Sequence, residues 1–203
     1  MCAVFHCTDE AKSSTASSTI KRQETYAKSI SCVSKAPIVC STALAAKLRR
    51  SKTRVHSISP GHRIRIGNTE ILGIEVQHGP IIAFRRTNIS FKPKMVGVGS
   101  IWFYFNIGNH TFLNLGDTLF LRDRSKDIKP DVLMVPVGGL MTMDLGEAIS
   151  AIQEIRPKTI VPVHYDWHLL VYHRKTNLER LETAMHDMRI AYCNIPPGAQ
   201  AEI

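Results

Sequence analysis

The stretch from residue 131 to residue 165 reads DVLMVPVGGLMTMDLGEAISAIQEIRPKTIVPVHY, and it decides the fold class. Its first apolar run, 132–137, is typical of a strand that is covered on both faces. Asp144 and Glu147 then form a capping-box pattern, and apolar residues follow at helical spacing. A second apolar run, 159–163, comes after the helix. The stretch therefore predicts a strand, a helix and a second strand in succession.

The same alternation continues towards the C-terminus. Thr176 and Glu179 form a second capping-box pattern before another set of apolar residues at helical spacing. Residues 190–195 are interpreted as a last strand, and the histidine-rich segment 164–173 as a loop. This order of strands and helices predicts helices that pack on a mixed sheet.

The upstream segment, residues 63–115, has a different pattern. Apolar and charged residues alternate at 63–66, and Gly67-Asn68 supplies the turn of a hairpin. An aromatic strand at 101–107 should place alternate side chains in the core. We expect an antiparallel β-meander over the whole segment.

The first part of the chain adds one strand and one helix to this plan. Residues 36–39 predict a short buried strand, and 42–50 predict a helix with leucines on one face. Residues 8–35 are rich in Ser, Thr and Lys, and we expect a mobile polar segment there. A chain of 203 residues, 44% of them hydrophobic, has the size of a single α+β domain over residues 1–203.

Charge and composition limit the classes of function. The net charge of +9 suits an anionic small-molecule substrate, whereas nucleic-acid binding is not expected because no aromatic residues interleave with the basic ones. No apolar run or signal-peptide pattern predicts membrane insertion or export, so we expect a cytoplasmic protein. The five cysteines form no C-x-x-C pair, and no G-x-S-x-G is present, which argues against a zinc ribbon and a serine-hydrolase elbow.

Three predicted strands end in a side chain that is able to bind a metal ion, namely His78, Asp117 and His164. Functional sites are commonly built at strand ends, and imidazole and carboxylate groups suit zinc, manganese or iron. The three residues are far apart in sequence, so spacing alone leaves surface histidines and a turn aspartate as alternatives.

Several motifs together resemble the metallo-β-lactamase superfamily, and most closely its ascorbate-6-phosphate-lactonase-like branch of metal-dependent hydrolases. The resemblance covers about residues 36–195 and depends on four segments in the family's order, 116–118, 131–139, 141–144 and 156–165. It implies an αββα sandwich with a two-metal site. By position, Asp117 matches the carboxylate that bridges two metals, His164 a ligand of the second metal, and His78 a ligand of the first.

This resemblance also implies a reaction. One or two zinc or manganese ions would activate a water molecule for attack on an ester, lactone or phosphoester.

The family's first signature, His-x-His-x-Asp-His, is degenerate here. An ungapped match keeps His6 as the first histidine and puts Glu10 at the aspartate, while Thr8 and Ala11 replace the other two histidines. His6 and Glu10 are therefore further candidate metal ligands.

The family's opening β-hairpin is also absent from the sequence. The expected fold is thus a partial αββα sandwich, N-terminally incomplete and lacking the first strands. Its open edge is consistent with a partner protein, with a homo-oligomer in which a second copy covers the edge, or with a truncated sequence. Three hypotheses stay open: a metal-dependent hydrolase, an inactive family member that acts as a binding or assembly module, and an RNA-binding or RNA-cleaving protein.

Overall fold

The computed structural model describes most of the chain from Pro37 onwards. The described residues are 3–4, 37–48, 54–76, 82–85, 88–91, 101–120, 122–139, 142–169, 172–196 and 199–202. The predicted polar segment at 8–35 lies outside them. No helix in these ranges is long and apolar enough to span a membrane.

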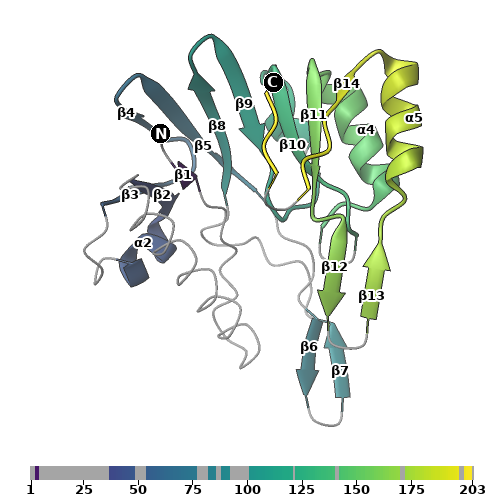
Figure 1. Ribbon diagram of the computed structural model, residues 1–203. Coiled ribbons are helices and arrows are strands. Elements are labelled where there is room, and N and C mark those ends of the chain that lie inside the picture. Colours follow the sequence, from purple (N-terminus) through teal and green to yellow (C-terminus); the bar gives the residue numbers. More distant parts are fainter. Residues whose placement is uncertain are drawn as a thin grey trace.

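A seven-stranded mixed sheet forms the centre of the molecule, in the order β14-β11-β10-β9-β8-β5-β4 (Figure 1). Its strands are β4 (Arg63–Ile66), β5 (Thr69–Glu75), β8 (Ile101–Ile107), β9 (His110–Asn114), β10 (Val132–Pro136), β11 (Thr159–Val163) and β14 (Ala191–Tyr192). Within this sheet, β9, β10, β11 and β14 are parallel to one another. The pairs β4–β5, β5–β8 and β8–β9 are antiparallel. The second half of the sheet is thus an α/β arrangement within the mixed sheet that the sequence predicts.

Two helices cover one face of this sheet. α4 (Leu145–Ile155) and α5 (Leu178–Met188) lie beside β10, β11 and β14 in Figure 1. Their buried residues, such as Ile152 and Leu181, share one core with Leu133 and Ile160 of the strands. A short helix, α3 (Arg122–Ser125), lies between β9 and β10 in the chain. The capping box predicted at the start of α4 is confirmed, since Asp144 and Glu147 satisfy each other's backbone N–H groups.

A second, smaller sheet covers part of the other face. It consists of the parallel strands β1 (Ala3–Val4), β2 (Ile38–Ser41) and β3 (Val55–Ile58), followed outwards by α2 (Thr42–Leu48). Val39 and Ile58 pack against Ile71 and Phe103 of the large sheet, while alternate residues of β2 pack against α2. The order of layers is therefore helix, sheet, sheet, helix, as expected for an αββα sandwich.

The aromatic strand β8 serves both cores, because both faces of the large sheet are covered. Phe103 and Phe105 face the small sheet, whereas Trp102 and Tyr104 belong to the core under α4 and α5. Both sets of alternating side chains of β8 therefore contribute to a core, whereas the pattern of the strand predicted burial of only one set.

Gly73, in β5, packs closely against the turn that joins the two sheets. A Cβ atom at this position would lie 2.8 Å from the backbone oxygen of Ser59. The backbone N–H and C=O of Gly73 also bond to His62 and Gly61 in the turn between the sheets. The missing side chain thus lets two backbones pack directly against each other.

Two hairpins correct the sequence analysis. β6 (Ile82–Arg85) and β7 (Asn88–Phe91) form a separate sheet, so β5 pairs directly with β8 and the meander over 63–115 is not continuous. β12 (Asp166–Leu169) and β13 (Tyr172–Lys175) form a second hairpin, where the sequence predicted a loop. Both errors concern segments whose pairing does not extend an existing sheet, which local patterns do not reveal.

The start of α5 and the last strand also differ from the predictions. Asn177 is the N-cap, because its side chain accepts the backbone N–H of Arg180, and Thr176 bonds elsewhere. The last strand is shorter than the predicted 190–195, because only Ala191–Tyr192 pairs with β11.

Candidate functional site

The parallel strands β9, β10 and β11 bring three loops to one side of the sheet. We call this side, where the three strands end, the carboxyl edge. It carries Asp117 after β9, Gly138 after β10 and His164 after β11. Residues that lie 47 positions apart in the chain, Asp117 and His164, thereby become neighbours. Carboxyl ends of parallel strands are where ligands bind in open α/β sheets.

A tight turn directs Asp117 away from the end of β9. Gly116 has a left-handed backbone (φ 53°), and its N–H donates to the side chain of Asn114 at 2.9 Å. The Asp117 side chain is 34% exposed. β9 ends at Asn114, and the turn at Gly116 leaves the carboxylate of Asp117 partly exposed outside the apolar core.

The imidazole of His164 faces the Asp117 carboxylate. Nε2 of His164 lies 3.8 Å from Oδ1 of Asp117, and the imidazole side chain is 24% exposed. This separation is too long for a hydrogen bond. Within the described part of the chain, Asp117 has no other polar partner. The two groups are therefore close, oriented towards each other and free to bind a third atom between them.

The other ring nitrogen of His164 is buried beside Gly138. Nδ1 has no hydrogen-bond partner among the described residues. A Cβ atom on Gly138 would lie 2.7 Å from this nitrogen and would overlap the backbone oxygen of His164. His164 itself has a left-handed backbone, with φ 58°. The ring thus occupies a slot that exists because residue 138 has no side chain.

The Asp117–His164 pair fits one side of a metal site. Two ligand atoms about 2.0–2.2 Å from one tetrahedral ion lie roughly 3.3–3.6 Å apart, which is close to the observed 3.8 Å. An imidazole nitrogen and a carboxylate oxygen are a suitable donor set for zinc or manganese. Among the described residues, no third His, Cys, Asp or Glu completes the set. The described donors therefore fit a metal ion but do not enclose one.

The remaining candidates from the sequence lie outside the described residues. These candidates are His78, His6 and Glu10. β5 runs in the same direction as β9, because each of them pairs antiparallel with β8. Val76, two residues before His78, therefore follows a strand that ends at the carboxyl edge.

The opposite side of the same strands, which we call the amino edge, holds a second carboxylate. Asp131 accepts hydrogen bonds from the N–H and the hydroxyl of Thr111, at 2.8 and 2.9 Å, and pairs with Lys158 at 2.6 Å. The Lys158 ammonium and the two Thr111 donors hold the pKa of Asp131 far below its usual range. This carboxylate joins the beginnings of β9, β10 and β11, and the sequence analysis did not single it out.

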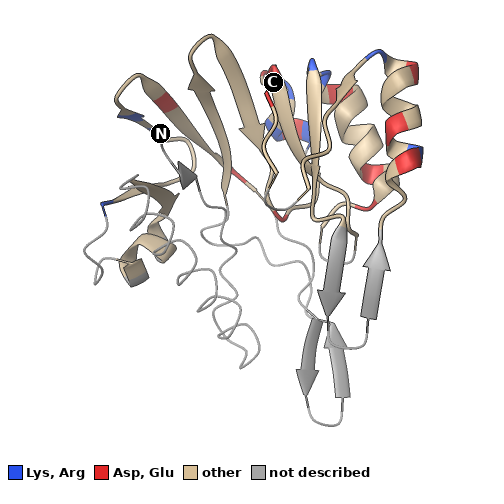
Figure 2. Ribbon diagram, in the orientation of Figure 1, with Lys and Arg blue, Asp and Glu red and all other residues tan. Residues whose placement is uncertain are grey.

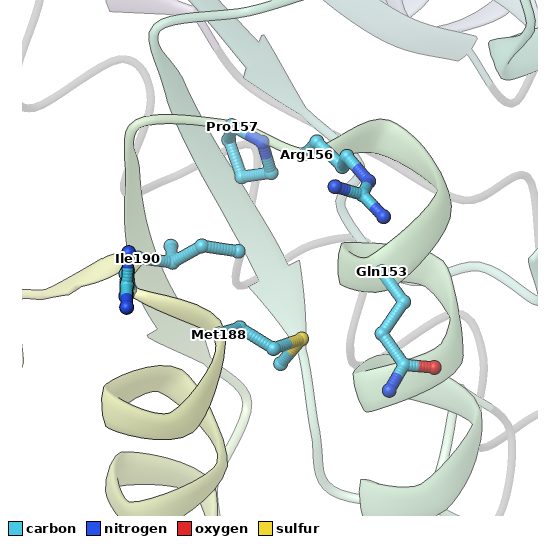
Figure 3. Close-up of a pocket in the computed structure, with 6 residues that line it drawn as sticks. Gln153, Arg156, Pro157, Met188 and Ile190 are labelled. Carbon is cyan, nitrogen blue, oxygen red and sulfur yellow. The ribbon is translucent and has the colours of Figure 1, made fainter.

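A pocket of about 560 Å³ also lies at the amino edge, away from Asp117 and His164 (Figure 3). Its lining comes from the C-terminal ends of α4 and α5, namely Gln153, Arg156, Pro157, Met188, Arg189 and Ile190. Figure 2 shows basic residues around this end of the helices and strands. The two arginines follow helix C-termini, where a positive charge offsets the helix dipole, so the pocket itself does not indicate an anion site.

Comparison with known proteins assigns a family to this arrangement. The family model described as "Beta-lactamase superfamily domain" matches residues 8–164. A UPF0173 metal-dependent hydrolase from Nanoarchaeum equitans is 30% identical over 111 residues, which are 53% of this chain and 51% of that protein. The chain spans about half the length of the curated relatives it matches.

Solved structures share the layered architecture. Igni18, a metallo hydrolase from Ignicoccus hospitalis, superposes with a TM-score of 0.65 at 16% identity, over 98% of this chain and 77% of that one. YhfI from Bacillus subtilis, a metallo-β-lactamase fold protein, superposes with a TM-score of 0.56 at 16% identity, over 90% and 71% of the two chains. At these identities the likeness concerns the fold.

Proposed function

The chain belongs to the metallo-β-lactamase superfamily, and on this premise we propose that it is a metal-dependent hydrolase whose metal ion binds at the carboxyl edge. The observation that carries the proposal is the open contact between Asp117 and His164. Their facing oxygen and nitrogen atoms lie 3.8 Å apart, and no described residue satisfies the carboxylate otherwise. Asp131, at the other end of the same strands and less exposed, is by contrast held by hydrogen bonds from Thr111.

In this proposal Asp117 and His164 would hold one metal ion, and His78, which matches a ligand of the other metal in the pattern that the sequence resembles, would help Asp117 to hold a second. The direction of β5 supports a role for His78, because that strand ends at the carboxyl edge. Up to three protein ligands for each ion leave a coordination position open for water or substrate. When bound, such an ion lowers the pKa of water and polarises a carbonyl or phosphoryl oxygen. His6 and Glu10 remain further proposed ligands.

In addition to holding the ion, Asp117 is able to orient a water molecule. With Oδ1 facing His164, Asp117 also offers its second carboxylate oxygen as a hydrogen-bond acceptor for a water molecule at the edge, because no described residue bonds to it. Thus one side chain can both hold the ion and orient a nucleophile. That combination suits hydrolysis of a polarised carbonyl or phosphoryl group.

The proposed substrate is an anionic ester, lactone or phosphoester. This class follows the ascorbate-6-phosphate-lactonase-like branch that the sequence resembles, and the net charge of +9 favours an anion. The presence of metal-dependent hydrolases among the relatives supports the reaction type.

The test is a measurement of bound metal together with hydrolysis. The full chain, purified without chelator, is assayed by elemental analysis and then titrated with Zn²⁺ or Mn²⁺ in a calorimeter. Activity is measured on a nitrophenyl acetate, a lactone and a nitrophenyl phosphodiester. We expect saturable binding of one or two ions and hydrolysis of at least one compound that EDTA abolishes. His164→Ala should remove both.

His186→Ala is the matched control. His186 also faces a carboxylate at 3.8 Å, that of Asp187, but both side chains are exposed on α5. This variant should bind metal and hydrolyse substrate as the unaltered chain does. A chain that binds neither ion contradicts the proposal and favours the alternative, an inactive family member that acts as a binding or assembly module.

A further inference from the structure

The slot that receives His164 is made by the absence of one side chain. A Cβ atom on Gly138 would overlap the carbonyl oxygen of His164 and lie 2.7 Å from its Nδ1. One of these atoms belongs to the backbone at the end of β11, which is held in register with β10 up to the Val137–Val163 hydrogen bond. A side chain at position 138 would therefore displace His164, residue 138 or both.

Gly138 is not needed for its own backbone conformation. Its neighbour Gly139 has a left-handed backbone (φ 74°), as does Gly116 on the adjoining loop (φ 53°), but Gly138 does not. Alanine would suit the φ angle of Gly138. The three atoms nearest to a Cβ at position 138 all belong to His164, so the two positions are coupled directly.

Thr176 holds the same two segments from the other side. Its hydroxyl donates to the backbone oxygen of Val137 at 2.8 Å, and its N–H donates to the backbone oxygen of Tyr165 at 3.0 Å. One bond ends at the residue before Gly138, and the other at the residue after His164. A single residue thus links both chain segments that form the slot.

We propose that Gly138 and Thr176 are positioning residues that fix the imidazole of His164 towards Asp117. The inference rests on the proposed function, because it concerns a residue that we propose as a metal ligand. The left-handed backbone of His164 strengthens the argument, since a conformation that is unfavourable for non-glycine residues persists only where the surroundings determine it. Gly138 leaves space for the imidazole ring, and Thr176 bonds to the two chain segments on either side of that space.

Gly138→Ala tests the space, with Gly73→Ala as its matched control. Both glycines have an ordinary φ, and at both a Cβ would meet a backbone oxygen, but Gly73 lies between the two sheets. We expect Gly138→Ala to weaken binding of Zn²⁺, measured by calorimetry on the full chain, by roughly 10–100-fold, the usual loss when a group that orients a ligand is altered. Gly73→Ala should lower the melting temperature but keep the affinity within about twofold of the unaltered chain. Unchanged affinity in Gly138→Ala overturns the inference.

Thr176→Val tests the clamp with a smaller perturbation, which keeps the inference testable even if Gly138→Ala does not fold. The variant loses the hydroxyl bond to Val137 and retains the N–H bond to Tyr165. We expect it to weaken Zn²⁺ binding, and Thr176→Ser to restore it. Thr183→Val is the control, because the Thr183 hydroxyl bonds within α5, to the oxygen of Glu179 at 2.9 Å. Equal affinities in Thr176→Val and Thr183→Val contradict a positioning role.

A second readout separates this inference from the proposed function. In the metal-free chain labelled with ¹⁵N-histidine, the ring signals of His164 report its surroundings directly, and His164→Ala identifies them. Gly138→Ala and Thr176→Val should shift these signals, whereas Gly73→Ala and Thr183→Val should not. If the unaltered chain binds no Zn²⁺, the proposed function fails, but shifted signals still support the positioning role. Unshifted signals in both positioning variants overturn it.

Discussion

The carboxyl edge and the amino edge of β9, β10 and β11 each present one carboxylate, and the two differ in how fully they are bonded. Asp131 receives two hydrogen bonds from Thr111 and an ammonium contact from Lys158. Asp117, at the other end of the same strands, has a single polar contact within the described residues, at 3.8 Å. The same sheet therefore holds one saturated and one open carboxylate.

This difference separates structural from functional use of the same chemical group. A carboxylate that stabilises the fold is surrounded by donors, because a poorly satisfied polar group costs stability. A carboxylate that binds an external ion must keep its lone pairs free until the ion arrives.

The largest expected effect comes from removing each charge in turn. Asp117→Asn should weaken Zn²⁺ binding by more than about 100-fold, since loss of a group that only orients a ligand already costs roughly 10–100-fold. The stability of this variant without metal should change by no more than about 0.5 kcal/mol, because the side chain is partly exposed and weakly bonded. Calorimetric titration and urea unfolding of the same samples measure the two quantities.

Asp131→Asn should give the reverse result. It removes the negative partner of Lys158 and of the Thr111 donors, so the melting temperature should fall while the Zn²⁺ affinity stays the same. If both variants lose stability alike and neither loses affinity, the division between the two edges is wrong.

The pH dependence of stability gives the next effect. The pKa of Asp131 in the folded chain lies well below its usual 3.8, so the folded state favours the ionised form. This contribution is therefore present above about pH 4 and is lost as the pH falls towards the folded pKa. Without metal, the difference in melting temperature between the unaltered chain and Asp131→Asn should be constant near neutral pH and shrink below about pH 4.

Thermal unfolding over that pH range, with EDTA present, checks the sign. A difference that grows on acidification would mean that Asp131 is not held in its ionised form by Thr111 and Lys158. The melting temperature of Asp117→Asn provides the reference, because that variant leaves the amino-edge contacts intact.

The smallest effect concerns the backbone at the two edges. Arg156 and Arg189 have left-handed φ angles of 53° and 56°, where they end α4 and α5, and His164 has one of 58° at the carboxyl edge. Arg156→Gly and Arg189→Gly should each stabilise the chain by about 0.5–1 kcal/mol, because the left-handed conformation costs other residues roughly 1–2 kcal/mol and the larger backbone entropy loss of glycine offsets part of the gain.

Urea unfolding measures this gain, and Zn²⁺ affinity should not change in either variant. A loss of stability would show instead that the guanidinium groups at the helix ends contribute more than the backbone strain removes. His164→Gly would remove the same backbone strain but also the proposed metal ligand. Of these three left-handed residues, only His164 would therefore lose a function on replacement by glycine.

Much of the fold follows from local patterns in the sequence. The strands β10 and β11, the capping box of Asp144 with Glu147, and the hairpin turn at Gly67 were all predicted, because each depends on residues that are neighbours in the chain. The incorrect predictions concern which distant residue a group bonds to or which strand a segment pairs with. Thr176 fits a capping pattern, but its hydroxyl finds the Val137 oxygen, 39 residues away, and Asn177 caps the helix instead.

For the candidate site, the sequence predicted which residues take part but not how they are arranged in space. The sequence placed Asp117 and His164 at the ends of strands, and resemblance to the superfamily joined them as ligands. Their roles in metal binding, and those of His78, His6 and Glu10, stay predictions. No local pattern in the sequence indicated that Gly138 makes room for the ring of His164.

The amino-acid sequence by itself determined the elements and the chemical groups at their ends, because hydrophobic periodicity, caps and turns act over a few residues. Only the tertiary structure decided that Asp117 remains open while Asp131 is saturated, and that Gly138 makes room for His164. Those outcomes depend on which strands lie side by side and in what register, and strand pairing joins residues whose separation along the chain leaves no local trace.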